Sequence, residues 1–445
     1  MASAIVARNS ECPPLAFDTM RVCILVTVAT LATARDSVRA QGDGTWSVMA
    51  QAIPLVTRAD PTAGQSVLTE GYLTQPIVMA HGSWRGLRGI ATLNFEGLTM
   101  ERGELVTGAY GEGYVDRRHP HAYVHELLAG TEQSYQGFRA SLFAGRGFAP
   151  FGSDDPMVRP FEKYPVNHHL AQVLERLVVV GAVRRGPVVG EFGVFNGDEP
   201  TGPGVPPTFD RFADSWASRV TVLPIPGLEL GASVANVVSP EVRVGHGLDQ
   251  HKGSLVARFS RETANEWRYA LLEWAGTDER DRGVVTTSLR SVLGEAGYCR
   301  AGAMLAARLE RTDRPEEEQT DNPFRAPRPA TDLSNLGVSR WTTITASLAA
   351  PRVTAAFLSG RPFVEIARIG VEPGEPPGIF NPELRYGTRR MWMYTAGIRL
   401  RTMRGAAMHD RMGRYGAALP DMPGMMAGMA MPGDMSNHQS NRCSL

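Results

Sequence analysis

The sequence predicts an all-β protein: a transmembrane antiparallel up-and-down β-barrel of about 16 strands with a disordered C-terminal tail. Two observations lead to this fold class. Segments that alternate apolar and polar side chains recur along most of the chain, and the connections between them alternate in length. Composition agrees, because Gly (47 residues) is enriched and the 46 basic side chains balance the 46 acidic ones. This charge balance excludes a nucleic-acid partner.

The N-terminal 40 residues have the pattern of a signal peptide. Met20 and Arg21 precede an apolar run over 22–34, and Ala40 follows small residues of the kind that signal peptidase reads. We therefore expect residues 1–40 to be a signal peptide with an upstream extension, and either Met1 or Met20 to be the start. The apolar run is too short to cross a bilayer as a helix, which needs about 20 residues.

The strand signal is clearest over residues 392–401. Trp392, Tyr394 and Ile398 share one parity, whereas Arg399 and Arg401 share the other, as expected for a strand with one apolar and one polar face. The same reading gives 16 strands, at 45–57, 76–84, 88–99, 121–135, 137–147, 172–185, 187–196, 215–223, 227–238, 252–260, 265–276, 284–292, 299–311, 338–349, 353–371 and 391–402.

Short and long connections alternate between these strands. A barrel produces this alternation because tight turns close its periplasmic end and extended loops lie at the other end. The predicted long connections are 58–75, 100–120, 148–171, 197–214, 239–251, 277–283, 312–337 and 372–390. The alternative, a secreted pair of β-sandwiches or a propeller, would show a constant repeat period, and we find none. An even strand number places both ends of a barrel over 44–402 in the periplasm.

Aromatic positions agree with a membrane barrel. Interfacial girdles place aromatic side chains near strand ends, where they face the lipid headgroups. Six tryptophans lie at or near predicted strand ends: Trp46, Trp84, Trp216, Trp267, Trp341 and Trp392.

Three stretches carry a resemblance to a known group of proteins: Asp116-Arg-Arg-His-Pro-His121, Phe195-Asn-Gly-Asp-Glu-Pro200 and Asp214-Ser-Trp216. With the barrel pattern, they resemble porin-like outer-membrane barrel proteins of Gram-negative bacteria over about residues 44–402. The resemblance implies an outer-membrane location and a channel function. One departure is that the chain continues past its last strand instead of ending on an aromatic residue.

Histidines before and within the fourth predicted strand form a candidate metal site. His119, His121 and His125 share a parity, so all three would face the lumen near one rim. Imidazoles in this arrangement suit Zn²⁺ or Cu²⁺. Glu126 would need a β-bulge to join them. The alternative is a hydrated, hydrogen-bonded histidine cluster.

The connection over 148–172 is the candidate pore constriction. It mixes both charge signs with several prolines, and such a loop either folds into the lumen or forms an external lid. With charged residues on inward strand positions, the candidate pore-lining set is Asp154, Asp155, Arg159, Arg308, Glu310, Arg399 and Arg401. No catalytic motif of a hydrolase, a nucleotide-binding protein or a metalloprotease occurs, so we assign no catalytic residue.

The last 43 residues, 403–445, predict a flexible periplasmic tail rich in methionine. Thioether and imidazole groups suit Cu(I), and a flexible chain brings several together. The candidate ligands are Met408, His409, Met422, Met425, Met426, Met429, Met431, Met435 and His438. The alternative is a disordered tail without ligands. Cys299 and Cys443 remain in the mature chain, and we expect them to stay unbridged because nothing in the sequence provides a disulfide framework.

The sequence therefore predicts a porin-like outer-membrane channel for small polar solutes or ions, with membrane lipid as its surroundings and no required cofactor. A copper-binding protein that the barrel anchors and whose tail holds Cu(I) is the alternative. An outer-membrane enzyme without a recognisable motif is the third hypothesis.

Overall fold

The computed structural model describes residues 44–62, 64–100, 104–106, 109–110, 122–198, 203–206, 209–239, 247–263, 265–316, 337–355, 358–402, 411–419 and 443. The predicted signal peptide lies outside these residues. Within them, no helix is both long enough and apolar enough to cross a membrane.

The architecture is one antiparallel sheet that closes on itself. Its first half contains β1 (Gly44–Asp60), β2 (Leu68–Trp84), β3 (Leu87–Asn94), β6 (Val124–Tyr135), β7 (Phe138–Gly147), β8 (Arg176–Arg185), β9 (Val188–Phe195) and β10 (Ser215–Ile225). Its second half contains β11 (Leu228–Val237), β12 (Asp249–Glu262), β13 (Glu266–Asp281), β14 (Val284–Arg300), β15 (Ala303–Glu316), β16 (Gly337–Ala349), β18 (Leu358–Pro373) and β19 (Arg390–Thr402).

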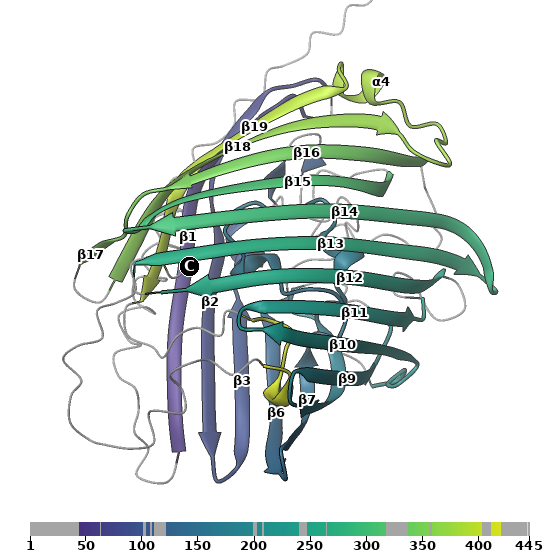
Figure 1. The fold of residues 1–445 in the computed structure, drawn as a ribbon. Coiled ribbons are helices and arrows are strands. Elements are labelled where there is room, and N and C mark those ends of the chain that lie inside the picture. The colour runs from purple at the N-terminus through teal and green to yellow at the C-terminus, as the bar shows by residue number, and fades with distance from the viewer. Residues whose placement is uncertain are drawn as a thin grey trace, which may run out of the picture.

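Pairing of the first strand with the last closes this sheet. β1 pairs with β2 on one side and with β19 on the other, and every other wall strand pairs with its neighbours in the chain (Figure 1). The three-residue β17 (Val353–Ala355) pairs with the start of β18 and only continues the ladder between β16 and β18. The wall is therefore a 16-stranded barrel, which confirms the predicted fold class and leaves no exposed sheet edge.

The remaining elements are short. They are α2 (Glu96–Thr99), the pair β4 (Leu105–Val106) and β5 (Ala109–Tyr110), the 3₁₀ turn η2 (Pro156–Val158), α3 (His168–Ala171), α4 (Pro382–Tyr386) and the 3₁₀ turn η3 (Gly416–Ala418). Several tight turns between strands place two residues at positive φ, as in Gln136–Gly137 and Ala301–Gly302. These angles match the type I′ geometry that follows the twist of a hairpin.

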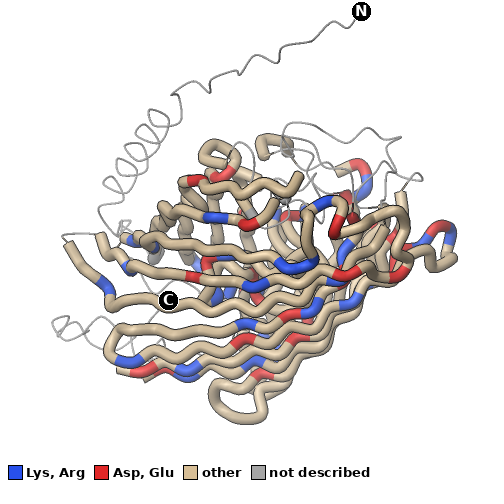
Figure 2. The backbone as a smooth tube through the Cα atoms, turned by 90° about the horizontal axis from the view of Figure 1, so that it is seen from above, with Lys and Arg blue, Asp and Glu red and all other residues tan. Residues whose placement is uncertain are grey.

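Side chains alternate between a lipid-facing exterior and a polar interior. On β15, Leu305 and Leu309 point outward and are 59% and 57% exposed, whereas Arg308 and Glu310 point inward and are 3% and 2% exposed. The alternation repeats around the wall. Exposed aliphatic side chains on this scale would be unfavourable in water, so the exterior is suited to a bilayer. Basic and acidic positions are interspersed along the strands (Figure 2).

Several expectations are wrong. The predicted strands 284–292 and 299–311 leave a connection over 293–298, but β14 continues to Arg300. The predicted long connection 277–283 is a tight turn between β13 and β14. Residues 96–99 form α2 instead of the end of a strand. Trp267 and Trp341 face inward and are buried, so they are not part of a girdle. Cys299 and Cys443 form a disulfide, so the expectation of unbridged cysteines is also corrected.

Candidate functional site

Two segments occupy the inside of the barrel and define the candidate site. The first is the inner loop, residues 148–175, which connects β7 to β8. The second is the C-terminal segment, residues 411–419, which follows β19. It contacts the inner faces of β7, β8 and β9 and lies beside β6 and β7 in the ribbon view (Figure 1). The expectation of a flexible tail is therefore wrong for these nine residues, which are almost all buried.

Apolar side chains hold the inner loop in the barrel. Phe151 packs into a cluster with Val180 and Phe195 of the wall, and Phe161 lies under the Arg308 guanidinium, 4.1 Å from its carbon. Gly152 permits the tight fold of the loop. It has a φ of +70°, and a Cβ there would come within 1.7 Å of a backbone oxygen. The loop is thus an internal element, and the alternative of an external lid is wrong.

Polar contacts connect the same loop to the strands on either side of β1. Glu162 accepts a hydrogen bond from Arg399 on β19 (2.8 Å), and Lys163 lies 2.7 Å from Glu104. Lys163 also contacts Tyr72. Because buried charges are costly without partners, these pairs fix the loop in one position.

The C-terminal segment contacts the inner loop and the wall through hydrogen bonds as well as apolar side chains. The Tyr415 hydroxyl accepts a hydrogen bond from the Phe148 backbone N–H (2.9 Å) and donates one to Glu126 (3.1 Å). The Ala417 backbone N–H donates to Ser141 Oγ (3.0 Å). Each contact joins the segment to β6, β7 or the start of the inner loop, so the segment fills the space beside these elements.

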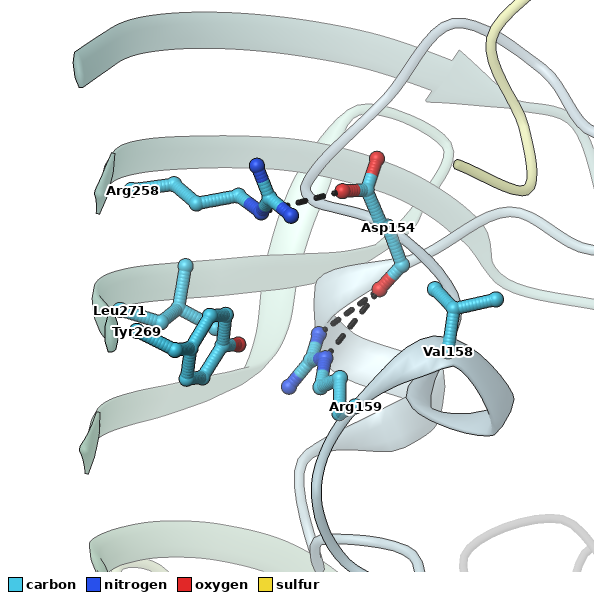
Figure 3. A pocket seen from close by; sticks show the side chains of 6 residues that line it. All are labelled: Asp154, Val158, Arg159, Arg258, Tyr269 and Leu271. Carbon is cyan, nitrogen blue, oxygen red and sulfur yellow. Dashed lines mark hydrogen bonds and ion pairs between the residues drawn. The ribbon is translucent and has the colours of Figure 1, made fainter. Parts of the chain in front are cut away.

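The two inserted segments meet at one ion cluster. Arg411 Nε lies 2.6 Å from Asp154 Oδ2, and Arg411 Nη2 donates to Glu229 Oε2 at 2.7 Å, with Nη1 contacting the other oxygen of Glu229. Arg414 lies 3.2 Å from Asp154 Oδ1. Arg258 approaches Asp154 from the wall at 3.5 Å (Figure 3). Asp154 therefore links the inner loop, the wall and the C-terminal segment.

The electrostatics of this cluster favour the charged forms. Burial alone would raise the pKa of Asp154, but the guanidinium groups of Arg411, Arg414 and Arg258 outweigh it and hold this pKa well below its usual range. Burial likewise opposes a charge on Arg411, yet Asp154 and Glu229 raise its pKa. Burial next to Arg219 and Arg411 lowers the pKa of Arg414 to about 10. The carboxylates of the cluster thus compensate the charge of Arg411 better than that of Arg414, the other guanidinium group of the C-terminal segment.

The structure places all seven predicted pore-lining residues inside the barrel. They are buried among charged partners: Asp154, Asp155, Arg159, Arg308, Glu310, Arg399 and Arg401. Arg159 donates two hydrogen bonds to the backbone oxygen of Asp154 (Figure 3). Asp154, Asp155 and Arg159 belong to the inner loop and the other four to the wall, and the role of all seven in lining a path for solutes stays a prediction.

The predicted histidine site is only partly within the described residues. His119 and His121 lie outside them, and His125 is fully buried against Glu175. A register shift between Thr92 and Leu93 inserts one extra residue in β6, so His125 and Glu126 both face inward, as the predicted bulge requires. In the described part of the chain, no group of three or more His, Cys, Asp or Glu side chains is placed to hold a metal ion.

The predicted copper ligands of the tail lie outside the described residues: Met408, His409, Met422, Met425, Met426, Met429, Met431, Met435 and His438. The Cu(I) site therefore stays a prediction. Met412, which lies between them in sequence, packs with Phe148 and Met157 as an apolar side chain.

Sequence reasoning missed the C-terminal segment as part of the site. Its only local signal is Arg411 and Arg414 followed by Tyr415 within a stretch that otherwise contains mostly small residues. Arginine and tyrosine together suit a buried polar contact better than a solvated tail. Their partners lie 182 or more residues away in the chain, so no sequence period reveals them.

No family model matches the chain, and no curated protein matches it. Among solved structures, the anion-selective porin from Comamonas acidovorans is 10% identical with a TM-score of 0.44, over 81% of this chain and 99% of that one. Outer-membrane expressed OmpT of Vibrio cholerae is 9% identical with a TM-score of 0.46, over 82% and 100%. OccK2 of Pseudomonas aeruginosa in complex with glucuronate is 10% identical with a TM-score of 0.37, over 82% and 100%. These similarities are too low to indicate a function.

Proposed function

We propose that this chain is an outer-membrane channel for small polar solutes or ions and that the described conformation is its closed state. The observation that carries the proposal is a closed 16-stranded wall with an apolar exterior and an interior bearing charges of both signs. A barrel of this strand number encloses more space than its own side chains fill. The inner loop and the C-terminal segment occupy part of this space.

The way in which the C-terminal segment is held inside the barrel favours a channel over a barrel whose lumen is permanently blocked. The C-terminal segment is not part of the wall. Ion pairs and hydrogen bonds hold it in place, together with apolar contacts of Met412, Tyr415 and Ala417. The ionic and hydrogen-bonding groups hydrate readily, so water can replace these partners when the segment leaves. The vacated space would then be lined by charged side chains and would hold water.

Orientation is part of this proposal. The start of β1 and the end of β19 lie at the barrel end that carries the tight turns, and we assign this end to the periplasm. A peptide tag near Gly204 should be accessible on intact cells, whereas a tag at Gly186 should be protected. The inverted result would overturn the assignment of the tail to the periplasm.

Single-channel recording in a planar bilayer tests the function. Asp154→Asn combined with Glu229→Gln leaves Arg411 buried without its carboxylates, which is costly, so the segment should dissociate and the open time should rise by about tenfold or more. Asp278→Asn is the matched control, because it removes a carboxylate that pairs with Arg290 near the tight turn between β13 and β14. Absence of conductance in the wild type and in the double variant would contradict a channel.

A further inference from the structure

One guanidinium group of the C-terminal segment is held by two carboxylates. Both terminal nitrogens of Arg411 face the two oxygens of Glu229, and Arg411 Nε faces Asp154 Oδ2 at 2.6 Å. This arrangement uses every nitrogen of the planar group. It is the bidentate geometry by which proteins recognise guanidinium in preference to a more compact cation.

Without the C-terminal segment, the carboxylates around Arg411 outnumber the guanidinium groups of the wall by one. Arg219 and Glu191 already form a bidentate pair, with nitrogen–oxygen distances of 2.6 and 2.7 Å. Arg258 is shared between Asp154 at 3.5 Å and Glu229 at 3.2 Å. The segment adds two guanidinium groups. Arg411 pairs with both shared carboxylates, whereas Arg414 lies between Asp154 at 3.2 Å and Glu191 at 3.7 Å.

We propose that Asp154 and Glu229 form a binding site for small solutes that carry a guanidinium group, and that Arg411 occupies this site as a built-in competitor. The proposal rests on the proposed channel function and names its solute class. When the C-terminal segment leaves, the site carries excess negative charge inside the lumen. A solute guanidinium then restores the charge balance and the hydrogen bonds that Arg411 provided.

Space for the rest of such a solute becomes available where the C-terminal segment leaves. With the segment in place, a cavity of only about 10 Å³, room for one water, is lined by Asp154, Arg258, Tyr269 and neighbouring side chains (Figure 3). Asp154 thus faces both Arg411 and the cavity. Arg258 lines the cavity and offers N–H donors to the carboxylate or carbonyl group of a solute such as an amino acid, whereas the Tyr269 hydroxyl already donates to Glu295 (2.9 Å).

Calorimetric titration of the full-length protein in detergent micelles tests the site. In a variant with Arg411→Ala and Arg414→Ala, L-arginine should bind about tenfold or more tightly than L-citrulline, which has the same shape but no charge. Adding Glu229→Gln should weaken arginine binding by about tenfold. Equal binding of the two amino acids, or arginine binding that Glu229→Gln leaves unchanged, would overturn the proposal.

A second measurement keeps Arg411 and Arg414 intact, in case their removal impairs folding. Ala417 is fully buried against Ser141, so an Ala417→Cys thiol should react slowly with a maleimide while the segment is in place. L-arginine should compete with Arg411, release the segment and raise the labelling rate, and L-citrulline should not. Equal labelling rates with the two amino acids would refute competition for this site.

These readouts separate the site from the channel. Binding and labelling do not require conduction, so selective arginine binding without conductance would remove the channel proposal and keep the site. Conductance without any difference between arginine and citrulline would keep the channel and overturn the guanidinium site.

Discussion

The two segments inside the barrel are held in different ways. The inner loop is fixed at both ends by β7 and β8 and buries large apolar side chains such as Phe151 and Phe161. The C-terminal segment follows β19, and Cys443 further along the chain forms a disulfide with Cys299 of β14.

The C-terminal segment is held by the polar contacts of Arg411, Arg414 and Tyr415 together with the apolar packing of Met412. Exposure of apolar side chains to water is unfavourable, whereas ionic groups are hydrated there. We therefore expect the loop to stay in the barrel and the segment to be able to leave it.

The largest expected effect is on the inner loop. Phe161→Ala removes a fully buried ring that packs under Arg308, so the free energy of unfolding should fall by about 3 kcal/mol. Urea unfolding in lipid vesicles measures this change. Phe209→Ala is the matched control because Phe209 is 74% exposed, and it should change the free energy by less than about 0.5 kcal/mol. Similar losses for the two variants would mean that the loop is not held by its apolar contacts.

The second effect distinguishes release from unfolding. Arg411→Ala with Arg414→Ala removes the charged contacts of the C-terminal segment, so the open time of the channel should rise by about tenfold. The free energy of unfolding of the wall should change little, because water replaces the segment. Arg268→Ala removes the guanidinium of an exposed pair with Glu266 and serves as the control. A loss of barrel stability as large as that of Phe161→Ala would contradict a removable segment.

The disulfide should matter less than these charges. Cys443 attaches the chain to Cys299 near the tight turn between β14 and β15. The C-terminal segment is also connected to the end of β19, because only eight residues separate Thr402 from Arg411. The eight-residue connection alone keeps the segment at a high effective concentration. Replacing Cys299 and Cys443 with Ser should therefore change the open time by less than about threefold. A change as large as that of the double arginine variant would make the disulfide the main restraint.

The smallest expected effect is that of mild acid. Because the guanidinium groups hold the pKa of Asp154 below its usual range, its contribution to docking is fully present above the ordinary value of about 3.9. That contribution is lost only as the pH falls through the lowered pKa. The open time should therefore be the same at about pH 7 and pH 5. An increase already at pH 6 would show that Asp154 is not the carboxylate that holds the segment.

Most of the wall could be predicted from the sequence because its signal is local. Period-two alternation, as over Trp392–Arg401, depends only on which face of a strand is in lipid. The turn predicted over 293–298 failed for a physical reason. Gly294 and Gly297 resemble turn residues, but a Cβ at Gly297 would lie 2.8 Å from the Trp267 ring. Gly297 therefore makes room for an inward tryptophan near one end of the β13–β14 pair.

The candidate site could be predicted only in part. The charges of Asp154 and Arg159 identified the inner loop as a candidate site, and its prolines favoured a folded loop. Neither feature shows whether the loop lies in the lumen or outside the barrel. The position of Arg411 depends on Glu229, 182 residues earlier in the chain, and on a loop from the opposite end of the barrel. Contacts of this kind arise only after the wall has closed.

The central claim is that the C-terminal segment closes the lumen and can leave it. An engineered disulfide between Ser141→Cys and Ala417→Cys, with the native cysteines replaced by Ser, tests it directly because Ser141 Oγ and the Ala417 nitrogen lie 3.0 Å apart. Single-channel recording should show a closed barrel when this bridge is formed and at least about tenfold more open time after reduction. Equal conductance of the bridged and reduced protein would contradict the claim.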